Sequence, residues 1–470
     1  MLTQTANGES LPSFWLRVRE FAVPPSTIET ATARRRAGDW AGACAAAGVD
    51  VDLDLRSVAR LHGQELAARI RADLRHLAPD LLRWHMPRIG PHGLLRPGVT
   101  IALARYEAAP NDGVRPLHLV VRTPPAWADA GQRMSLALWD GSHAGAGARR
   151  HPHPHPNRRF RLDLHRHLWD ARRTGELAIR SGAGRHPLRR PAGDPDGLEL
   201  VPQGGACAVD RWADEAGVLL HAEGRTSGTV AVRLGSRHRL HLHVLAEGDA
   251  DADGPGPPSL RIAEAAADDG APAPPVLPDA ATWVLPDLEL LRTGAVEADR
   301  LHPLVVAALV PDHMPAGPSP TPNTAGQPRL VDCRGAQHRI GLVDGVLVPL
   351  DHDPVEIRRE ELLVALTGTP LPCLRAIDEA HRHPDCLTGV RERLDHGDIT
   401  GALAVVEGLL GPGAVLRSGA LRDELEAAAR RRITYGLFRA DLIGPGPVRY
   451  RPDHVLLRDP RSRSRHLTPR

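Results

Sequence analysis

The residues with the clearest capacity for chemistry are histidines, and their densest run is His151-Pro-His-Pro-His-Pro156. Imidazole nitrogens bind zinc and other transition metals, so this run is a candidate metal-binding tract. Proline favours the polyproline II helix, with about three residues per turn, which makes His151, His153 and His155 project in different directions. We therefore expect a solvated loop here.

Asp163, His165 and His167 form a better-aligned set shortly after this tract. If residues 160–167 form one strand, these three side chains lie on the face opposite the apolar residues of that strand. One carboxylate with two imidazoles suits Zn, Fe or Mn. The other interpretation, which we favour, is the polar outer face of a half-buried strand.

A third set has the spacing Gly-x5-His-x-His-x3-Glu-x6-Gly, formed by Gly235, His241, His243, Glu247 and Gly254. Over about twenty residues this pattern resembles the first metal motif of the cupin family, small β-barrels that often hold Fe, Mn or Zn. The resemblance implies that His241, His243 and Glu247 are metal ligands on an enzyme. The family's second motif, Pro-x-Gly-x2-His-x3-Asn, is not found downstream, since Pro315-Ala-Gly317 has Pro320 where His is needed. An ordinary solvated strand end is the alternative interpretation of these residues.

Other catalytic arrangements lack essential residues. The group Cys373, His381, His383 and Cys386 does not have the usual pair spacing of zinc ligands, so we expect buried thiols and helix-end histidines. All 59 basic residues are arginine, which excludes a Schiff-base lysine, a Walker-type phosphate-binding lysine and a kinase strand lysine. A nucleophile elbow of the G-x-S-x-G type is also missing.

Composition indicates a protein of a reducing compartment. The 470 residues suffice for several domains, and abundant Ala, Gly, Pro and Arg without Lys indicate a high-GC bacterium. A formal net charge of +2 argues against a dedicated nucleic-acid binder. Five scattered cysteines, an N-terminus without signal-peptide features and no apolar run of about 18 residues predict a cytoplasmic protein with no membrane contact.

Hydrophobic periodicity predicts an α+β fold. Residues 1–95 are expected to form a helical unit, in which one long helix begins near Asp54 and carries a buried stripe to Leu81, with a kink or restart at Pro79. Residues 96–248 are expected to form an antiparallel β sandwich or barrel. Its predicted strands are 99–104, 117–122, 134–139, 160–164, 177–179, 218–222, 229–234 and 239–245.

The second half is expected to contain linkers and a C-terminal unit. Residues 249–328 are predicted to form linkers around a short helical unit. Residues 329–440 are predicted to form a β-hairpin, closed by a type I′ turn at Asp344-Gly345, followed by helices. The helices are expected at 353–368, 374–382, 386–395, 399–409 and 419–436, before a solvated basic tail at 441–470.

One pattern occurs near both ends of the chain. Gly38-Asp-x-x-Gly-Ala and Gly397-Asp-x-x-Gly-Ala each place a helix-ending glycine before an aspartate that can cap the next helix. Each resembles the turn of a tetratricopeptide-type helical hairpin, although no repeat period is found. We expect ordinary antiparallel hairpins whose helices approach closely at the second glycine.

These observations favour a cytoplasmic protein–protein interaction or scaffold protein without a cofactor or catalytic site of its own. The alternative is a metal-dependent enzyme with Zn, Fe or Mn in the central β domain, held by the cupin-like set or by Asp163, His165 and His167. The sequence does not identify the partner, the substrate or the oligomeric state.

Overall fold

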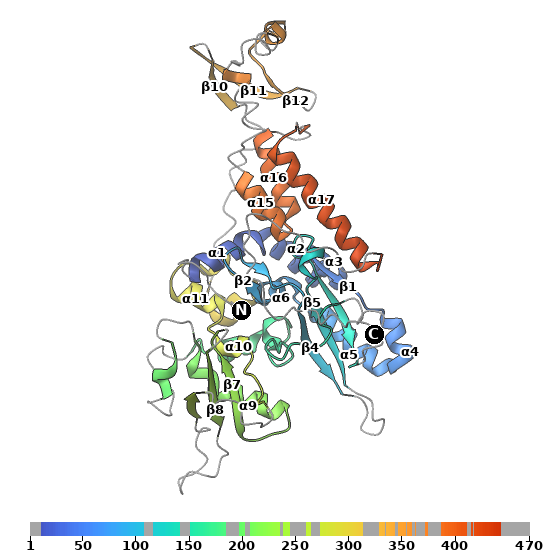
Figure 1. The fold of residues 1–470 in the computed structure, drawn as a ribbon, viewed down its shortest axis with the longest axis vertical. Coiled ribbons are helices and arrows are strands. Elements are labelled where there is room, and N and C mark those ends of the chain that lie inside the picture. Colours follow the sequence, from blue (N-terminus) through green and yellow to red (C-terminus); the bar gives the residue numbers. More distant parts are fainter. Residues whose placement is uncertain are drawn as a thin grey trace, which may run out of the picture.

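The mixed α+β class is confirmed by the computed structural model of the chain. The structure describes residues 11–107, 116–141, 151–184, 197–202, 207–235, 238–244, 260–264, 273–313, 329–333, 335–343, 346–353, 355–359, 362, 372–374, 387–410, 415–416 and 418–442. Helices and small sheets alternate along it, and the C-terminal helices rise above a larger body (Figure 1). No helix in these ranges is both long enough and apolar enough to cross a membrane.

The N-terminal part is helical, as predicted, but its long helix is divided. Its helices are α1 (Leu11–Phe21), α2 (Pro25–Arg36), α3 (Trp40–Ala46), α4 (Leu55–His62), α5 (Gln64–His76) and α6 (Pro79–His85). The break between α4 and α5 lies at Gly63, which has a φ of +91° that other residues rarely adopt. Pro79 restarts the helix as predicted, and Ile70, Leu74 and Leu81 of the predicted stripe are buried.

A four-stranded sheet packs beside these helices. It consists of β1 (Val49–Val51), β4 (Thr100–Tyr106), β5 (Leu117–Arg122) and β6 (Met134–Trp139), in the order β1-β6-β5-β4. The pairs β4–β5 and β5–β6 are antiparallel, whereas β1 is parallel to β6. The three longer strands confirm the period-two prediction. The short β1 strand was not predicted, because Val-Asp-Val is too short for its period to be read.

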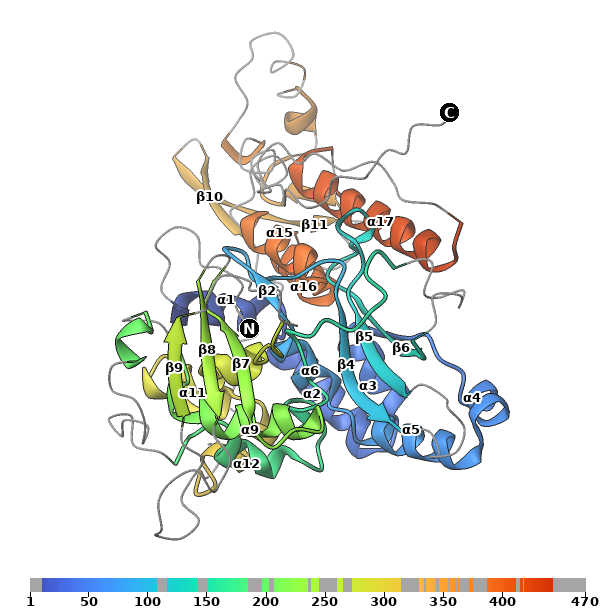
Figure 2. The same cartoon turned by 60° about the horizontal axis from the view of Figure 1, so that its bottom comes forward.

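A second, separate sheet contains β7 (Gly228–Arg233), β8 (Arg239–Val244) and β9 (Leu260–Glu264), all antiparallel. Figure 2 shows the two sheets on different sides of α6. The described strands thus form open sheets and not one closed barrel. The helix α9 (Trp212–Ala222) packs on β7 and β8, so the strand predicted at 218–222 is wrong. Its apolar residues Trp212, Ala216 and Leu219 or Leu220 are buried at helical spacing.

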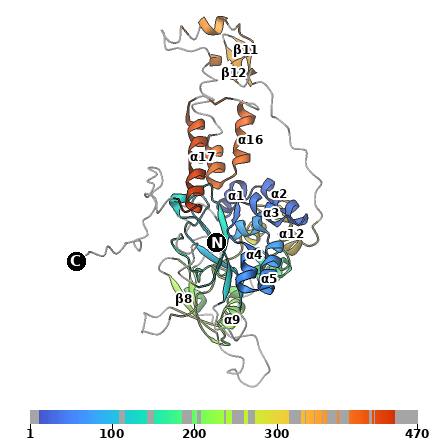
Figure 3. The ribbon, with the colours of Figure 1, turned by 90° about the vertical axis from the view of Figure 1, so that its right-hand side faces the viewer.

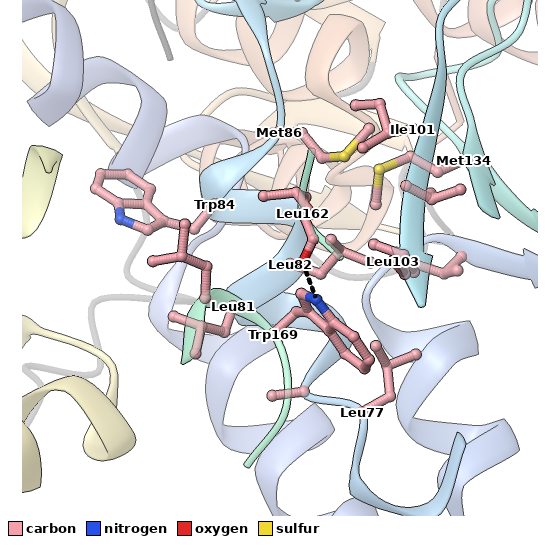
Figure 4. Packing of buried hydrophobic residues seen from close by; sticks show 14 of the residues in the cluster. Leu77, Leu81, Leu82, Trp84, Met86, Ile101, Leu103, Met134, Leu162 and Trp169 are labelled. Carbon is pink, nitrogen blue, oxygen red and sulfur yellow. Dashed lines mark hydrogen bonds between the residues drawn. The ribbon is translucent and has the colours of Figure 1, made fainter. Parts of the chain in front are cut away.

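The strand predicted at 160–164, and its possible extension to residue 167, are also wrong. Residues 161–176 form turns and the short helices η2 (Arg166–Leu168) and η3 (Thr174–Glu176), and the strand predicted at 177–179 is the helix α8 (Leu177–Arg180). The indole N–H of Trp169 donates to the carbonyl oxygen of Leu162, 3.0 Å away, and folds the segment back on itself (Figure 4). Both side chains are buried in the core.

One hydrophobic core joins the helices to the first sheet. In Figure 4, Leu82 of α6 lies near Leu103 of β4 and Trp169, and Trp84 of α6 and Met134 of β6 belong to the same core. Three helices from farther along the chain pack on the same core or beside it: α10 (Asp279–Thr282), α11 (Pro286–Arg292) and α12 (Pro303–Leu309). The remaining short elements are β2 (Arg88–Ile89), β3 (Leu94–Leu95), η1 (Ala126–Ala128), η4 (Gly197–Leu200), η5 (Val209–Arg211) and η6 (Ala298–Arg300). The predicted unit boundary near residue 95 stays a prediction, although side chains from both sides of it share this core.

The C-terminal unit follows its predicted order. It contains β10 (Arg329–Cys333), β11 (Ala336–Val343), β12 (Val346–Pro349), α15 (Leu387–His396), α16 (Ile399–Leu410) and α17 (Ala420–Arg439). The antiparallel pairing of β11 with β12 confirms the hairpin, while its turn at 344–345 lies outside the described residues. Figure 3 shows α16 and α17 as parallel columns between the small sheet and the body. Residues 355–359 and 372–374 are helical, and the rest of the helices predicted at 353–368 and 374–382 falls outside the described residues.

The repeated pattern forms the same turn twice. Gly38 and Gly397 have φ values of +79° and +85° and end α2 and α15. The carboxylate of Asp39 accepts from the N–H of Gly42 at 2.8 Å, and Asp398 accepts from Gly401 at 2.9 Å. An added Cβ at either second glycine would collide with this capping carboxylate. The second glycine therefore makes room for the cap, and not for close helix approach as predicted.

Candidate functional site

The cupin-like histidines do not converge with a carboxylate in the described structure. His241 and His243 lie on one face of β8, as predicted, with ring centroids 6.5 Å apart. The ring of His243 bonds the Thr229 hydroxyl at 3.0 Å. Glu247 lies outside the described residues. Within the ranges that the structure describes, no group of three or more His, Cys, Asp or Glu residues could hold a metal ion.

The predicted set Asp163, His165 and His167 is divided among different partners. Asp163 is held by Arg161, whose guanidinium donates to both carboxylate oxygens at 2.9 Å. His165 lies 3.0 Å from Glu215, which also accepts two bonds from Arg180.

Their burial determines how these groups ionise. Burial alone would raise the pKa of Glu215, but the bonds from Arg180 and His165 outweigh it and hold this pKa well below its usual range. Burial lowers the pKa of His167 far below that of a free imidazole. The expectation that these imidazoles lie on a solvated strand face is therefore wrong, because both rings are only 1% exposed.

The His-Pro tract is likewise only partly solvated. His151 is buried, and its Nε2 lies 2.8 Å from the carbonyl oxygen of Thr123. His153 and His155 are exposed, as expected for a loop. The tract is thus anchored to the first sheet through its first histidine. Of the Cys/His group near the C-terminal helices, Cys373 is buried as expected, and His381, His383 and Cys386 lie outside the described residues.

A groove of about 500 Å³ includes His151 in its lining. Its walls come from three distant parts of the chain: the start of α4, the strands β5 and β6, and the C-terminal end of α17. Its size falls within the range of ligand pockets, roughly 300–1,000 Å³. We call it the β6 groove. Its apolar lining includes Leu53, Leu61, Leu138, Trp139 and Phe438.

The β6 groove contains a strand edge that the sheet leaves uncovered. The N–H of Met134 donates to Gly48, and the carbonyl of Leu136 accepts from Asp52, so both residues direct their backbone groups toward β1. Because backbone direction alternates along a strand, Leu138 faces the same side. There β1 has ended, and no hydrogen bond among the described residues uses the N–H or C=O of Leu138 on that side. A buried unpaired backbone group would be costly, but Leu138 is half exposed and open to a partner.

Exposed charges at the groove mouth are acidic. Asp52, Asp54 and Asp140 are exposed, whereas Arg122 is buried and Arg439 is half-buried. Asp54 also caps α4, and its bonds to the hydroxyl and N–H of Ser57 and to the N–H of Arg56 lower its pKa. The Asp54 carboxylate therefore stays ionised at neutral pH and attracts a basic group.

The wall formed by the C-terminal end of α17 is held in place by a polar cluster at Asp50. Arg133 donates to both oxygens of Asp50, at 2.9 and 2.7 Å, and the Tyr435 hydroxyl donates at 2.7 Å. Burial alone would raise the pKa of Asp50, but these bonds outweigh it and lower this pKa. Arg439 adds ion pairs with Asp50 and Asp52. The end of α17 is thus fixed beside the groove, which reduces the cost of ordering on binding.

Sequence reasoning missed this groove because its walls are far apart in the chain. One usable signal was Leu61, a large apolar residue outside the buried stripe, which is 77% exposed. Comparison with known proteins provides no further guidance. No protein-family model, no curated protein and no solved structure matches the chain.

Proposed function

We propose that the chain is a protein–protein interaction or scaffold protein, and that its β6 groove binds an extended segment of a partner protein. The observation that carries this proposal is the uncovered backbone of Leu138 between an apolar floor and an acidic mouth. Extended peptides add to open sheet edges through main-chain hydrogen bonds, while pockets for alternate side chains provide specificity.

The lining indicates which segment fits. One apolar side chain would pack against Leu61 and Trp139, which leave apolar surface at the groove. Burial of one Leu-sized side chain contributes about 1.5–3 kcal/mol. An arginine or lysine nearby in the same segment would face Asp54 and Asp140 at the mouth. The partner motif is therefore an extended segment with apolar and basic residues.

Selection from a random linear peptide library tests this proposal. We expect peptides with alternating apolar and basic residues, and we expect Leu61→Glu to weaken their binding about tenfold or more, because it removes one apolar contact. Ile179→Glu is the matched control, since Ile179 is also 77% exposed but does not line the groove. Fluorescence polarisation measures the affinities. Failure to enrich any peptide, or equal weakening by both variants, would refute the proposed function.

We also propose a reducing, cytoplasmic location. Cys44 and Cys207 are thiols in the structure, and burial raises their pKa values to about 12 and about 11, which makes them unreactive. Alkylation of the denatured protein, purified without reductant, should modify all five cysteines. A mass that shows fewer than five adducts would indicate a disulfide and contradict the proposal.

A further inference from the structure

A second cavity, of about 450 Å³, lies where the C-terminal helices meet the body. Its walls are the start of α2, the end of α3, the loop before β6, the turn between α15 and α16, and α17. Figure 1 shows α2 and α3 directly beneath these C-terminal helices. We call it the interhelix cavity. It does not overlap the β6 groove, with which it shares no lining residue.

Positive charge dominates the lining of the interhelix cavity. Four arginines and one aspartate line it: Arg83, Arg133, Arg431, Arg432 and Asp398. Two of these arginines are neutralised, because Arg133 pairs with Asp50 and Arg431 lies 3.2 Å from Asp395.

The aspartate does not balance the other two arginines. Asp398 pairs with Arg393, 2.9 Å away, and caps α16. Arg83 and Arg432 therefore remain without a carboxylate partner among the described residues.

Arg83 is an unusual cation, since it is buried and bonded only to carbonyl oxygens. Its guanidinium donates to Ala22 at 2.9 Å, to Gln132 and His396 at 2.7 Å, and to Ala47 at 3.5 Å. Burial lowers its pKa to about 10, so it stays protonated at neutral pH. A buried charge is costly when no opposite charge compensates it. An anion in the cavity would provide that compensation.

Neutral donors surround the same space. Its lining includes the hydroxyl-bearing residues Ser26, Thr27, Thr30 and Thr400, of which Thr30 already donates to the carbonyl oxygen of Ser26 at 2.8 Å. The cap residue of α2 is Pro24, which offers no side-chain hydrogen bond. The first-turn N–H of Ser26 therefore has no hydrogen-bond acceptor within the described structure. Free N–H groups at a helix start favour bound anions.

We propose that the interhelix cavity binds a small molecule that carries a phosphate monoester. A phosphate monoester bears a charge of about −1.5 to −2 at pH 7 and three acceptor oxygens. This charge suits Arg83 and Arg432, neither of which has a carboxylate partner among the described residues. The exposed guanidinium of Arg432 can also pair with two phosphate oxygens in a bidentate manner. Because the ligand would contact α2 and α17 together, its binding stabilises the docking of the C-terminal helices on the body.

Thermal unfolding of the full chain with inorganic phosphate, pyrophosphate or AMP tests this site. We expect at least one of them to raise the unfolding temperature above that in sodium chloride of equal ionic strength. Arg432→Gln should weaken that ligand about tenfold or more, since it removes a charged hydrogen bond. Arg432 is exposed, so this variant is expected to fold.

Arg430→Gln is the matched control, because Arg430 lies on the same helix, is 66% exposed and does not line the cavity. It should bind the ligand with the wild-type affinity. The proposal is overturned if none of the three probes exceeds the chloride effect, or if Arg432→Gln binds as tightly as Arg430→Gln. The β6 groove is unaffected by either outcome, because peptide binding is measured separately.

Discussion

The two copies of the repeated turn make a direct test of how the C-terminal helices are held. Gly38 and Gly397 adopt nearly the same backbone, with φ values of +79° and +85°. A Cβ at Gly38 would meet nothing within 4 Å, whereas one at Gly397 would collide with the backbone of Gly131. The variants Gly38→Ala and Gly397→Ala therefore differ in this contact alone.

The expected magnitudes follow from that difference. In each variant, alanine in the left-handed region lowers folding stability by about 1–2 kcal/mol. The partial gain in stability from a less flexible unfolded chain is about equal in the two variants. The collision at Gly397 involves backbone on both sides, so it adds about 1–3 kcal/mol, as overpacking typically does. We expect Gly38→Ala to lower stability only locally, and Gly397→Ala to loosen the contact between α15 and the body.

Native-state hydrogen exchange measures both effects. The amides of α2 and α3 report on the first turn, and those of α15 and α16 report on the second. Exchange in α15 and α16 should accelerate more in Gly397→Ala than exchange in α2 and α3 does in Gly38→Ala. Equal acceleration, within about 0.5 kcal/mol, would refute the reasoning that the Gly131–Gly397 contact docks the C-terminal helices.

Burial lowers the pKa of His396 from 6.5 to about 3, so its neutral form contributes stability that is present above pH 6.5 and lost as the pH falls toward 3. Urea denaturation at pH 7, 5 and 4 should show this loss as a falling free energy of unfolding. The fall should be smaller in His396→Gln than in the wild type, and an equal fall in both proteins would contradict the assignment to His396. Tyr435→Phe removes a hydrogen bond to ionised Asp50 and should lower the free energy of unfolding, measured by urea denaturation, by about 1.5–3 kcal/mol. Thr434→Val is the control and should lower it much less, because the Thr434 hydroxyl bonds only within α17. Elemental analysis of untagged protein should find no stoichiometric metal. One metal per chain that is lost in the double variant His241→Ala, His243→Ala would instead favour the alternative function, a metal-dependent enzyme.

Local signals in the sequence predicted a large part of the fold. The alternation in 117–122 and 134–139 identified β5 and β6 because each strand has one face in the core. The bounds of the helices α15, α16 and α17 were predicted to within a few residues, because glycine and aspartate mark helix ends. The shared turn at Gly38 and Gly397 was visible for the same reason.

Other elements depend on contacts that no local pattern encodes. Short apolar runs at 177–179 and 218–222 fit a strand and a buried helix equally well, and tertiary packing selected the helix. His165 and His167 were expected to face water, but the fold buries them beside Glu215 and Arg180. The groove could not be predicted, since it requires β1 to end opposite Leu136 and α17 to return beside α4.

The exchange rate of the Leu138 amide tests the central claim most directly. Hydrogen–deuterium exchange with residue-level fragmentation should compare the free protein with its complex with a peptide selected on it. We predict fast exchange at Leu138 in the free protein and strong protection in the complex, because the peptide backbone pairs with this strand edge. Protection that is already complete in the free protein, or a complex that leaves the Leu138 amide unprotected, would contradict the account.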